Sequence, residues 1–371
     1  MLREFCIQKM TRSSRVRIYR IKESNPPMTN QLELGLDTFG DVTQDDNGIT
    51  QSYATVIRDL VDQAVLADEI GVDFIGVGEH HRDDFAVSSP EMVLATIAGR
   101  TSRIRLGSAV TVMSSDDPVR VFERFATLDA LSNGRAEVIL GRGSFTESFP
   151  LFGYDLHDYE ILFEEKVGLF AELLKERPVT WKGTTRSSLT NQMVYPTTES
   201  GRLTTWIGVG GSPQSVIRAA RFAMPLMLAI IGGSPVRFKP LVDLYWRQLE
   251  TLGSAPLPVG IHSPGYVADT DEQARDEMWP HMKVMRDRIG AERGWGPIQR
   301  SDFDRDAGPD GSWYVGSPET VARKIAATAK TLEISRFDMK YSAGRLPHSK
   351  LMRSIELYGT RVIPLVRDML S

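Results

Sequence analysis

The sequence predicts an α/β protein that folds as a (β/α)8 barrel (TIM barrel) with insertions after barrel strands. Two observations support this fold class. Eight short β-type segments alternate with helical patterns from Leu32 onward, and helix-start signals with proline fall between them. A barrel of about 250 residues plus insertions also fits a chain of 371 residues. An open doubly wound sheet is the alternative architecture.

The eight predicted strands are short runs rich in apolar and β-branched residues. They span residues 32–37, 73–81 (with the turn beyond the strand), 104–112, 136–141, 204–210, 225–231, 258–268 and 336–341. Parallel strands joined by helices are buried on both faces, which accounts for nearly continuous apolar runs such as AEVILG.

Helices are predicted between the strands from caps and apolar spacing. Five dipeptides offer an N-cap residue followed by proline: Ser89-Pro90, Asp117-Pro118, Ser212-Pro213, Ser234-Pro235 and Ser317-Pro318. Apolar residues three and four apart mark one face of the first helix at Ile57, Leu60, Ala64, Ala67 and Gly71. The same spacing marks the closing helix at Leu351, Ile355, Tyr358, Val362 and Leu365.

The chain divides into a short leader and one barrel domain. Residues 1–27 hold seven Lys or Arg but only Glu4 and Glu23 as acids, so residues 1–29 are expected to be a disordered or mis-assigned extension. A transit peptide is the alternative. Residues 30–371 form the barrel domain, with insertions at about 178–202 and 271–313 that are expected to become lids or interfaces.

Composition and charge exclude several classes of protein. The formal net charge is −4 with interspersed charges, so neither a nucleic acid nor a membrane surface is expected as a partner. No apolar run approaches the roughly 20 residues that span a bilayer. Cys6 is the only cysteine, which excludes an internal disulfide framework and a cysteine zinc site, and is consistent with the cytoplasm.

Two glycine-rich turns after strands predict an anion site. Gly141-Arg142-Gly143-Ser144 supplies a guanidinium, and Gly208 to Ser215 supplies Gly210, Gly211, Ser212 and Ser215 at a helix start. Both turns lack the third glycine of the dinucleotide fingerprint, so a mononucleotide phosphate is favoured over NAD. The alternative is that Ser212-Pro213 serves only as a helix cap.

Glu79-His80-His81 follows the second strand, where a barrel exposes catalytic residues. Adjacent side chains of an extended segment point to opposite sides, so at most one of the two histidines is expected to face the pocket. A purely structural pair is the alternative. No HExxH spacing occurs, and no metal site is expected.

These segments together resemble the bacterial-luciferase-like family of flavin-dependent monooxygenases. The resemblance lies in EHH (79–81), GSAVTVMSSDDPVRVFERFATLDALSNGR (107–135), GRGSFTESFPLFGYD (141–155) and IGVGGSPQS (207–215), in that order, and it extends over roughly Leu32 to Ser371. It implies a (β/α)8 barrel that binds reduced FMN (FMNH2), uses O2 to oxidise a small organic substrate, receives its flavin from an NAD(P)H:flavin reductase and forms a homodimer.

By position, the resemblance assigns phosphate contacts to Arg142, Ser144, Gly211, Ser212 and Ser215, and the catalytic histidine to His80. It also implies a non-prolyl cis peptide at Ala109-Val110, beneath the flavin ring. Gly141 and Ser148 stand where luciferase carries a reactive cysteine and an acidic residue. These two departures argue against long-chain aldehyde oxidation with light emission, not against flavin binding.

Three other functions stay open at this stage. They are hydride transfer with the deazaflavin F420, flavin binding without catalysis, and a flavin-free barrel acting on sugar phosphates. The walls of the substrate pocket are expected to come from Phe39, Met113, Phe145, Phe149, Tyr266 and the 178–202 insertion.

Overall fold

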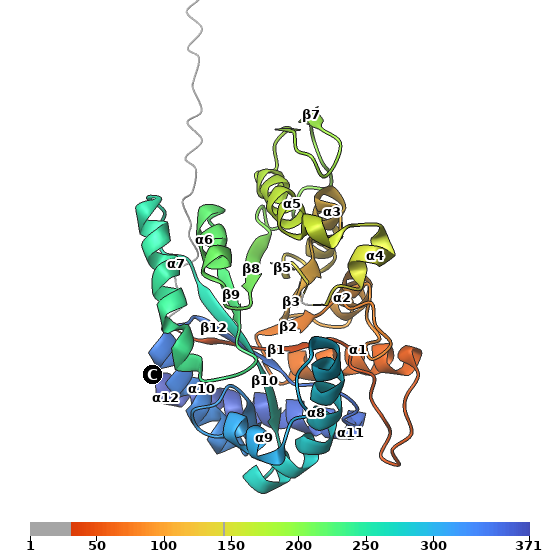
Figure 1. The fold of residues 1–371 in the computed structure, drawn as a ribbon, viewed down its shortest axis with the longest axis vertical. Helices are drawn as coiled ribbons and strands as arrows, with labels where there is room; N and C mark the ends of the chain where they lie inside the picture. Colours follow the sequence, from red (N-terminus) through yellow and green to blue (C-terminus); the bar gives the residue numbers. More distant parts are fainter. Residues whose placement is uncertain (1–30, 144) are drawn as a thin grey trace, which may run out of the picture.

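Eight parallel strands close into a barrel in this computed structural model, which describes residues 31–143 and 145–371. In spatial order the barrel strands are β1 (Glu33–Thr38), β2 (Phe74–Val77), β3 (Arg105–Ser108), β5 (Ala136–Gly141), β8 (Thr204–Val209), β9 (Leu226–Ala229), β10 (Val259–Val267) and β12 (Arg336–Lys340). Strand β12 pairs with β1 and closes the ring (Figure 1). The predicted barrel and its eight strands are therefore confirmed. The predicted extension 1–29 and Ser144 lie outside the described residues.

Helices follow the barrel strands and cover the outside of the barrel (Figure 1). They are α1 (Tyr53–Glu69), α2 (Pro90–Ala98), α3 (Pro118–Leu131), α4 (Ser148–Phe152), α5 (Tyr159–Leu173), α6 (Pro213–Arg221), α7 (Lys239–Thr251), α8 (Asp271–Arg293), α9 (Arg300–Ala307), α10 (Pro318–Leu332), α11 (His348–Leu357) and α12 (Ile363–Leu370). Short 3-10 turns precede α5 (η1, Leu156–Asp158) and α7 (η2, Pro235–Phe238).

All five predicted Pro-marked helix starts occur in the structure. The side chains of Asp117, Ser212 and Ser317 accept hydrogen bonds from backbone amides of the first turn. Ser89 and Ser234 make no such bond, and Ser234 opens the 3-10 turn η2. Proline at the first helical position, rather than the cap side chain, is the feature that all five starts share.

The closing helix is interrupted by one wider turn. Residues Tyr358–Val362 form a π-helical turn, η3, between α11 and α12. Such a turn takes in one extra residue, so the buried face shifts along the sequence. Val366 is buried and Leu365 only half-buried, whereas the regular spacing predicted Leu365.

The two insertions lie apart from each other. The first contains the antiparallel hairpin β6 (Val179–Trp181) and β7 (Leu189–Gln192), which projects beyond α5 (Figure 1). The second contains α8 and α9 and ends at β11 (Tyr314–Gly316), a short strand that pairs with the end of β10. Helix α8 lies across the barrel, far from the hairpin (Figure 1).

The inside of the barrel is filled by large side chains set against glycines. Phe74, Ile139, Trp206 and Met227 form an apolar cluster there, separate from the core between strands and helices. A Cβ on Gly107 would lie 2.8 Å from the Phe74 ring. Glycine on one strand therefore provides the space that a large side chain from the next strand occupies.

A buried ion cluster completes the barrel interior. The Arg336 guanidinium, with no exposed surface, donates to both carboxylate oxygens of Asp338 at 2.9 and 3.0 Å and to Glu137 at 2.6 Å. It also lies 3.5 Å from the centroid of the Phe74 ring. Burial acts to raise the pKa of Glu137, but the Arg105 and Arg336 charges outweigh it and lower that pKa. Burial raises the pKa of Asp338 to about 6 despite Arg336.

The substitution Gly35→Ala tests whether the ion cluster around Arg336 needs the space that Gly35 leaves. A Cβ at position 35 would collide with the Asp338 carboxylate and push it from Arg336. We expect the free energy of unfolding to fall by about 1–3 kcal/mol, the usual cost of overpacking a core. Gly296→Ala is the control, because a Cβ there meets nothing within 4 Å and its φ is not in the left-handed region. Equal denaturant midpoints for the two variants would contradict this account.

Candidate functional site

A cavity of about 430 Å³ opens at the carboxyl ends of the barrel strands. Its floor and sides come from the last residues of the strands, among them Asp37, Gly141, Gly208 and Lys340. Residues of α8 form the roof, including Met282, Met285 and Ile289. Apolar side chains dominate the lining, with a few polar groups between them, as in most small-molecule sites.

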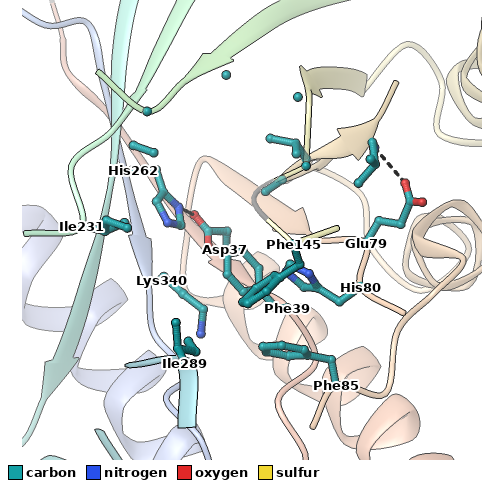
Figure 2. A pocket seen from close by; sticks show the side chains of 18 of the residues that line it. Asp37, Phe39, Glu79, His80, Phe85, Phe145, Ile231, His262, Ile289 and Lys340 are labelled. Carbon is teal, nitrogen blue, oxygen red and sulfur yellow. Dashed lines mark hydrogen bonds and ion pairs between the residues drawn. The ribbon is translucent and has the colours of Figure 1, made fainter. Parts of the chain in front are cut away.

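His80 lies in an aromatic cage in this cavity. Its ring contacts those of Phe39, Phe85 and Phe145, at centroid distances of 4.6, 4.4 and 5.2 Å (Figure 2). Among the described residues, neither ring nitrogen has a hydrogen-bond partner. Burial lowers the pKa of His80 to about 3, and Lys340 and Arg82 add to this effect while Asp41 opposes it. The imidazole is therefore neutral at physiological pH.

His81 also lines the cavity, so the prediction that at most one histidine faces it was wrong. Strand β2 ends at Val77, so the alternation of side chains along a strand does not apply to Glu79, His80 and His81. The His81 Nε2 atom lies 2.9 Å from Glu79 Oε1. The other Glu79 oxygen accepts a hydrogen bond from the Val112 amide at 2.9 Å (Figure 2).

The Ala109-Val110 peptide is cis, at the position that the family resemblance implied. Both residues line the cavity, and they separate β3 from the short strand β4 (Thr111–Val112). A Cβ on Gly141 would collide with the Val110 side chain, and one on Gly208 would lie 3.2 Å from it. The close approach of Val110 thus favours glycine at position 141.

Arg142 lies at the edge of the cavity beside a carboxylate that the sequence did not suggest. Its guanidinium forms an ion pair with Glu160 and lies 5.0 Å from the centroid of the Tyr159 ring. The second Glu160 oxygen accepts from Arg218 of α6 at 2.8 Å. Glu160 therefore links Arg142 to Arg218, which lies in the last turn of α6.

The start of α6 is built as a cap next to open space. Ser212 Oγ accepts from the Ser215 amide at 3.2 Å and donates to Ser215 Oγ at 2.8 Å. Gly211 has φ of +118°, which favours glycine, and a Cβ on Gly210 would meet nothing within 4 Å. Gly210 lines the cavity, while Gly211, Ser212 and Ser215 do not. Ser212 can cap α6 while an anion binds beside it, because the backbone amides that precede the first turn have no partner within the helix.

Helix α8 is held over the cavity by an ion-pair network around Arg82. Its side chain, 6% exposed, donates to Asp84 at 3.0 Å, to Glu147 at 2.5 Å and to Glu292 of α8 at 2.6 Å. These carboxylates raise the pKa of Arg82 even though burial opposes them, with Glu292 having the largest effect. Arg288 of α8 adds an ion pair with Asp83. Helix α8, in the 271–313 insertion, is thus tied to the chain that follows β2.

Asp37 and His262 form a pair that sequence reasoning missed. His262 Nδ1 lies 2.6 Å from Asp37 Oδ2, and both residues line the cavity (Figure 2). Asp37 is the next-to-last residue of β1 and His262 lies on β10, strands that both neighbour β12. The alternation of side chains along β1 could have indicated Asp37. Leu34 and Leu36 belong to the core outside the barrel, so Gly35 and Asp37 face inward.

Three expected wall residues are not in the cavity. Phe39 and Phe145 line it, but Met113, Phe149 and Tyr266 are buried in packing elsewhere. The 178–202 insertion does not line it either, because the hairpin projects away from α8 (Figure 1). Apolar character alone does not separate a wall residue from a core residue.

The described residues hold neither a cluster of metal-ligating side chains nor a helix that could cross a membrane. Within residues 31–143 and 145–371, no three His, Cys, Asp or Glu side chains come together as a metal site. In the same part of the chain, no helix has both the length and the apolar composition to cross a membrane.

Comparison with known proteins identifies the family. The family described as luciferase-like monooxygenase matches residues 38–333. The chain belongs to this family. It is 31% identical over 337 residues to the uncharacterized protein y4vJ of Sinorhizobium fredii, covering 87% of this chain and 95% of that protein.

Solved structures of more distant proteins share the luciferase-like barrel. The oxygenating constituent of 3,6-diketocamphane monooxygenase from Pseudomonas putida, in complex with FMN, aligns with a TM-score of 0.72 at 18% identity, over 90% of this chain and 98% of that one. A coenzyme F420-dependent tetrahydromethanopterin reductase from Methanopyrus kandleri aligns with a TM-score of 0.67 at 17% identity, over 90% and 99%. These likenesses concern the fold.

The depressed pKa of His80 predicts a loss of stability in acid. Its folded pKa of about 3 lies below the ordinary value of 6.5, so the unfolded chain takes up the proton first. The contribution of His80 is complete above pH 6.5 and is lost as the pH falls towards 3, by up to about 1.4 kcal/mol per pH unit. The measurement is the free energy of unfolding of wild type and His80→Gln from neutral to acidic pH.

His80→Gln should show the shallower pH dependence of the two. His157→Gln is the matched control, since His157 is exposed and outside the cavity, and its pKa is raised by the hydrogen bond to Asp155. Parallel curves for wild type and His80→Gln would refute the burial of a neutral imidazole.

Proposed function

We propose that this protein is a flavin-dependent monooxygenase that uses reduced FMN and O2 to oxidise a small organic substrate. The observation that carries the proposal is that Arg142 and Gly210, on the glycine-rich turns after β5 and β8, both line a largely apolar cavity that α8 covers. FMN carries a phosphate and a flat ring joined by a ribityl chain, and the guanidinium and the apolar lining would suit the phosphate and the ring.

The residues fit FMN on this chain's own geometry. The phosphate would be held by Arg142, by the backbone at Gly210 and Gly211, and by the hydroxyls of Ser212 and Ser215. The open space at Gly210 is the cradle for it. Ser144 would complete this set. The ring would rest over Ala109 and Val110, whose backbone lines the floor.

When bound, reduced FMN supplies the two electrons with which O2 yields one oxygen atom for the product and one for water. The protein binds and orients the substrate and excludes bulk water beneath α8. His80, neutral in its aromatic cage, holds a proton on one nitrogen and a lone pair on the other. We assign it the role of catalytic hydrogen-bonding and proton-transferring group.

The proposed partners follow from this chemistry. An NAD(P)H:flavin reductase would deliver the reduced flavin, because the chain lacks a dinucleotide fingerprint. We further propose a homodimer acting in the cytoplasm.

An F420-dependent oxidoreductase is the second candidate. The reductase from Methanopyrus kandleri, whose structure is similar, is named for that coenzyme. Both cofactors carry a phosphate and a flat ring, so the cavity alone does not separate them. A flavin-binding protein without turnover is the remaining alternative.

The test combines binding with oxygen uptake. Binding of FMN and F420 to the purified protein is compared by calorimetry, and oxygen uptake with FMNH2 is measured with and without candidate substrates. Preferred FMN binding with formation of an oxygenated product supports the proposal. Preferred F420 binding, or FMN binding without any product, would favour the respective alternative.

Arg142→Ala should weaken FMN binding by about 1–3 kcal/mol, the value of a charge-assisted contact to phosphate. Fluorescence titration measures the affinity. The matched control is Arg221→Ala, because Arg221 lies at the far end of α6 and pairs with Glu164 at the surface. An unchanged affinity in Arg142→Ala would place the phosphate elsewhere.

Glu160→Gln should strengthen FMN binding. The Glu160 carboxylate, 63% exposed, occupies Arg142 and Arg218 and repels an incoming phosphate. Its neutralisation should improve the affinity by about 0.2–1 kcal/mol, the range of an exposed ion pair. Glu172→Gln, a change farther along α5, serves as the control. Weaker binding in Glu160→Gln would mean that the carboxylate positions Arg142 instead of competing with the phosphate.

A further inference from the structure

The Asp37–His262 pair is a candidate for chemistry that the flavin site does not use. It lies on the part of the barrel wall formed by β1, β12 and β10, whereas Arg142 follows β5 and α6 follows β8. Asp37 is paired in register with Lys340, and His262 with Asp338, so the two side chains meet across the intervening strand β12. A long-range contact of this kind is fixed by the closed barrel rather than by local sequence.

The pair has the geometry of a carboxylate-oriented base. The Asp37 side chain is 1% exposed, and among the described residues its Oδ1 atom has no hydrogen-bond partner. Its other oxygen lies 2.6 Å from His262 Nδ1. A carboxylate that accepts from Nδ1 keeps the proton there and leaves the lone pair on Nε2. Within the described chain, Nε2 has no partner, and the ring is 13% exposed in the cavity wall.

Two charged side chains next to the Asp37–His262 pair, Asp338 and Lys340, already have partners within the barrel. Asp338 is bonded to Arg336 beneath the floor. Lys340 donates to Asp41 at 2.9 Å and to the Ser342 carbonyl at 2.6 Å. The roof adds Arg286 and Arg293, which face the same cavity from α8. The same lining includes the carboxylates of Glu79, Glu147 and Asp338, so side chains of both charges face the cavity.

Aromatic rings surround the position in front of the pair. Phe39 stacks on the His262 ring at a centroid distance of 5.9 Å and an interplanar angle of 12°. Phe85 and Phe145 continue this surface on the side of His80. Flat faces of this kind favour a planar ring as ligand, because offset stacking adds to the burial of apolar area.

We propose that His262, oriented by Asp37, is the general base for a phenolic hydroxyl of the substrate. This inference rests on the proposed monooxygenase function and names the substrate class of that site. The phenol O–H bond breaks and an N–H bond forms at His262 Nε2, giving phenolate and imidazolium. No electrons are transferred in this step, and the proton returns to the product oxygen. The phenolate ring is richer in electrons than the phenol and thus more readily oxidised.

The test uses 4-cyanophenol as the probe, since its nitrile infrared band reports whether the hydroxyl is ionised. The full-length protein is mixed with the probe, with and without oxidised FMN, at a pH where the free phenol is neutral. Wild type should bind the phenolate. His262→Gln and Asp37→Asn should bind the neutral phenol or lose it. The ether 4-cyanoanisole, which has no proton to give, supplies the reference band for a neutral ring.

His157→Gln is the matched control, because His157 and Asp155 form the same Nδ1–carboxylate pair at 2.8 Å on the surface, outside the cavity. It should behave as wild type. If Asp37→Asn does not fold, as judged by circular dichroism, His262→Gln alone decides the question. A neutral probe in wild type, phenolate that persists in His262→Gln, or no binding of the probe to wild type would each overturn the proposal.

A measurement of turnover separates the proposed role of His262 from the proposed monooxygenase function. With a phenolic substrate and FMNH2, His262→Gln should lose at least about 100-fold in kcat while its affinity for FMN is unchanged. If wild type does not bind FMN, the proposed monooxygenase function is wrong, but the measured ionisation of the bound phenol is unaffected. Equal turnover in wild type and His262→Gln would contradict the proposed role of His262 as a base and leave the monooxygenase function unaffected.

Discussion

The buried guanidinium of Arg336 is the interaction on which the barrel interior depends. It joins Asp338 on its own strand to Glu137 on β5 and lies over Phe74 from β2, so it links three parts of the ring. An ion cluster in a low dielectric is favourable only when every charge is matched, and loss of one partner typically costs about 3–5 kcal/mol. The cluster sits directly below the cavity, where Asp338 forms part of the floor. Stability of the barrel and shape of the site are therefore set by the same side chains.

Above this floor, the cavity has two chemically distinct sides. One side holds Arg142 and Gly210, and Arg142 pairs with Glu160, which also accepts a hydrogen bond from Arg218 of α6. The other combines the Asp37–His262 pair with matched charges from β12. Aromatic rings around Phe39 join them, since Phe39 contacts both His80 and His262. Helix α8 closes the top through Arg82, which binds carboxylates from three separate segments. Polar groups at opposite sides and apolar surface between them suit a cofactor and a substrate bound side by side.

Local features of the site could be found without a structure. The glycine-rich turns after β5 and β8 follow apolar strands directly, so their place at the carboxyl edge was predictable, as was that of His80 after β2. The cis peptide at Ala109-Val110 was implied only by the family resemblance. His81 was misjudged because alternation holds only while the backbone stays extended, and β2 ends at Val77. Met113, Phe149 and Tyr266 were misjudged because buried apolar side chains look alike in sequence, whether they face a cavity or the core.

The sequence by itself determined the barrel, its eight strands, the helix starts and the family, because these depend on apolar spacing, caps and turns within short segments. Only the tertiary structure decided which charges meet. Arg82 with Glu292, Glu160 with Arg142, and Asp37 with His262 are separated by 210, 18 and 225 residues. No local pattern encodes such pairs. The path of α8 brings Glu292 to Arg82, closure of the ring brings His262 to Asp37, and the return of the chain from β5 to α5 brings Glu160 to Arg142.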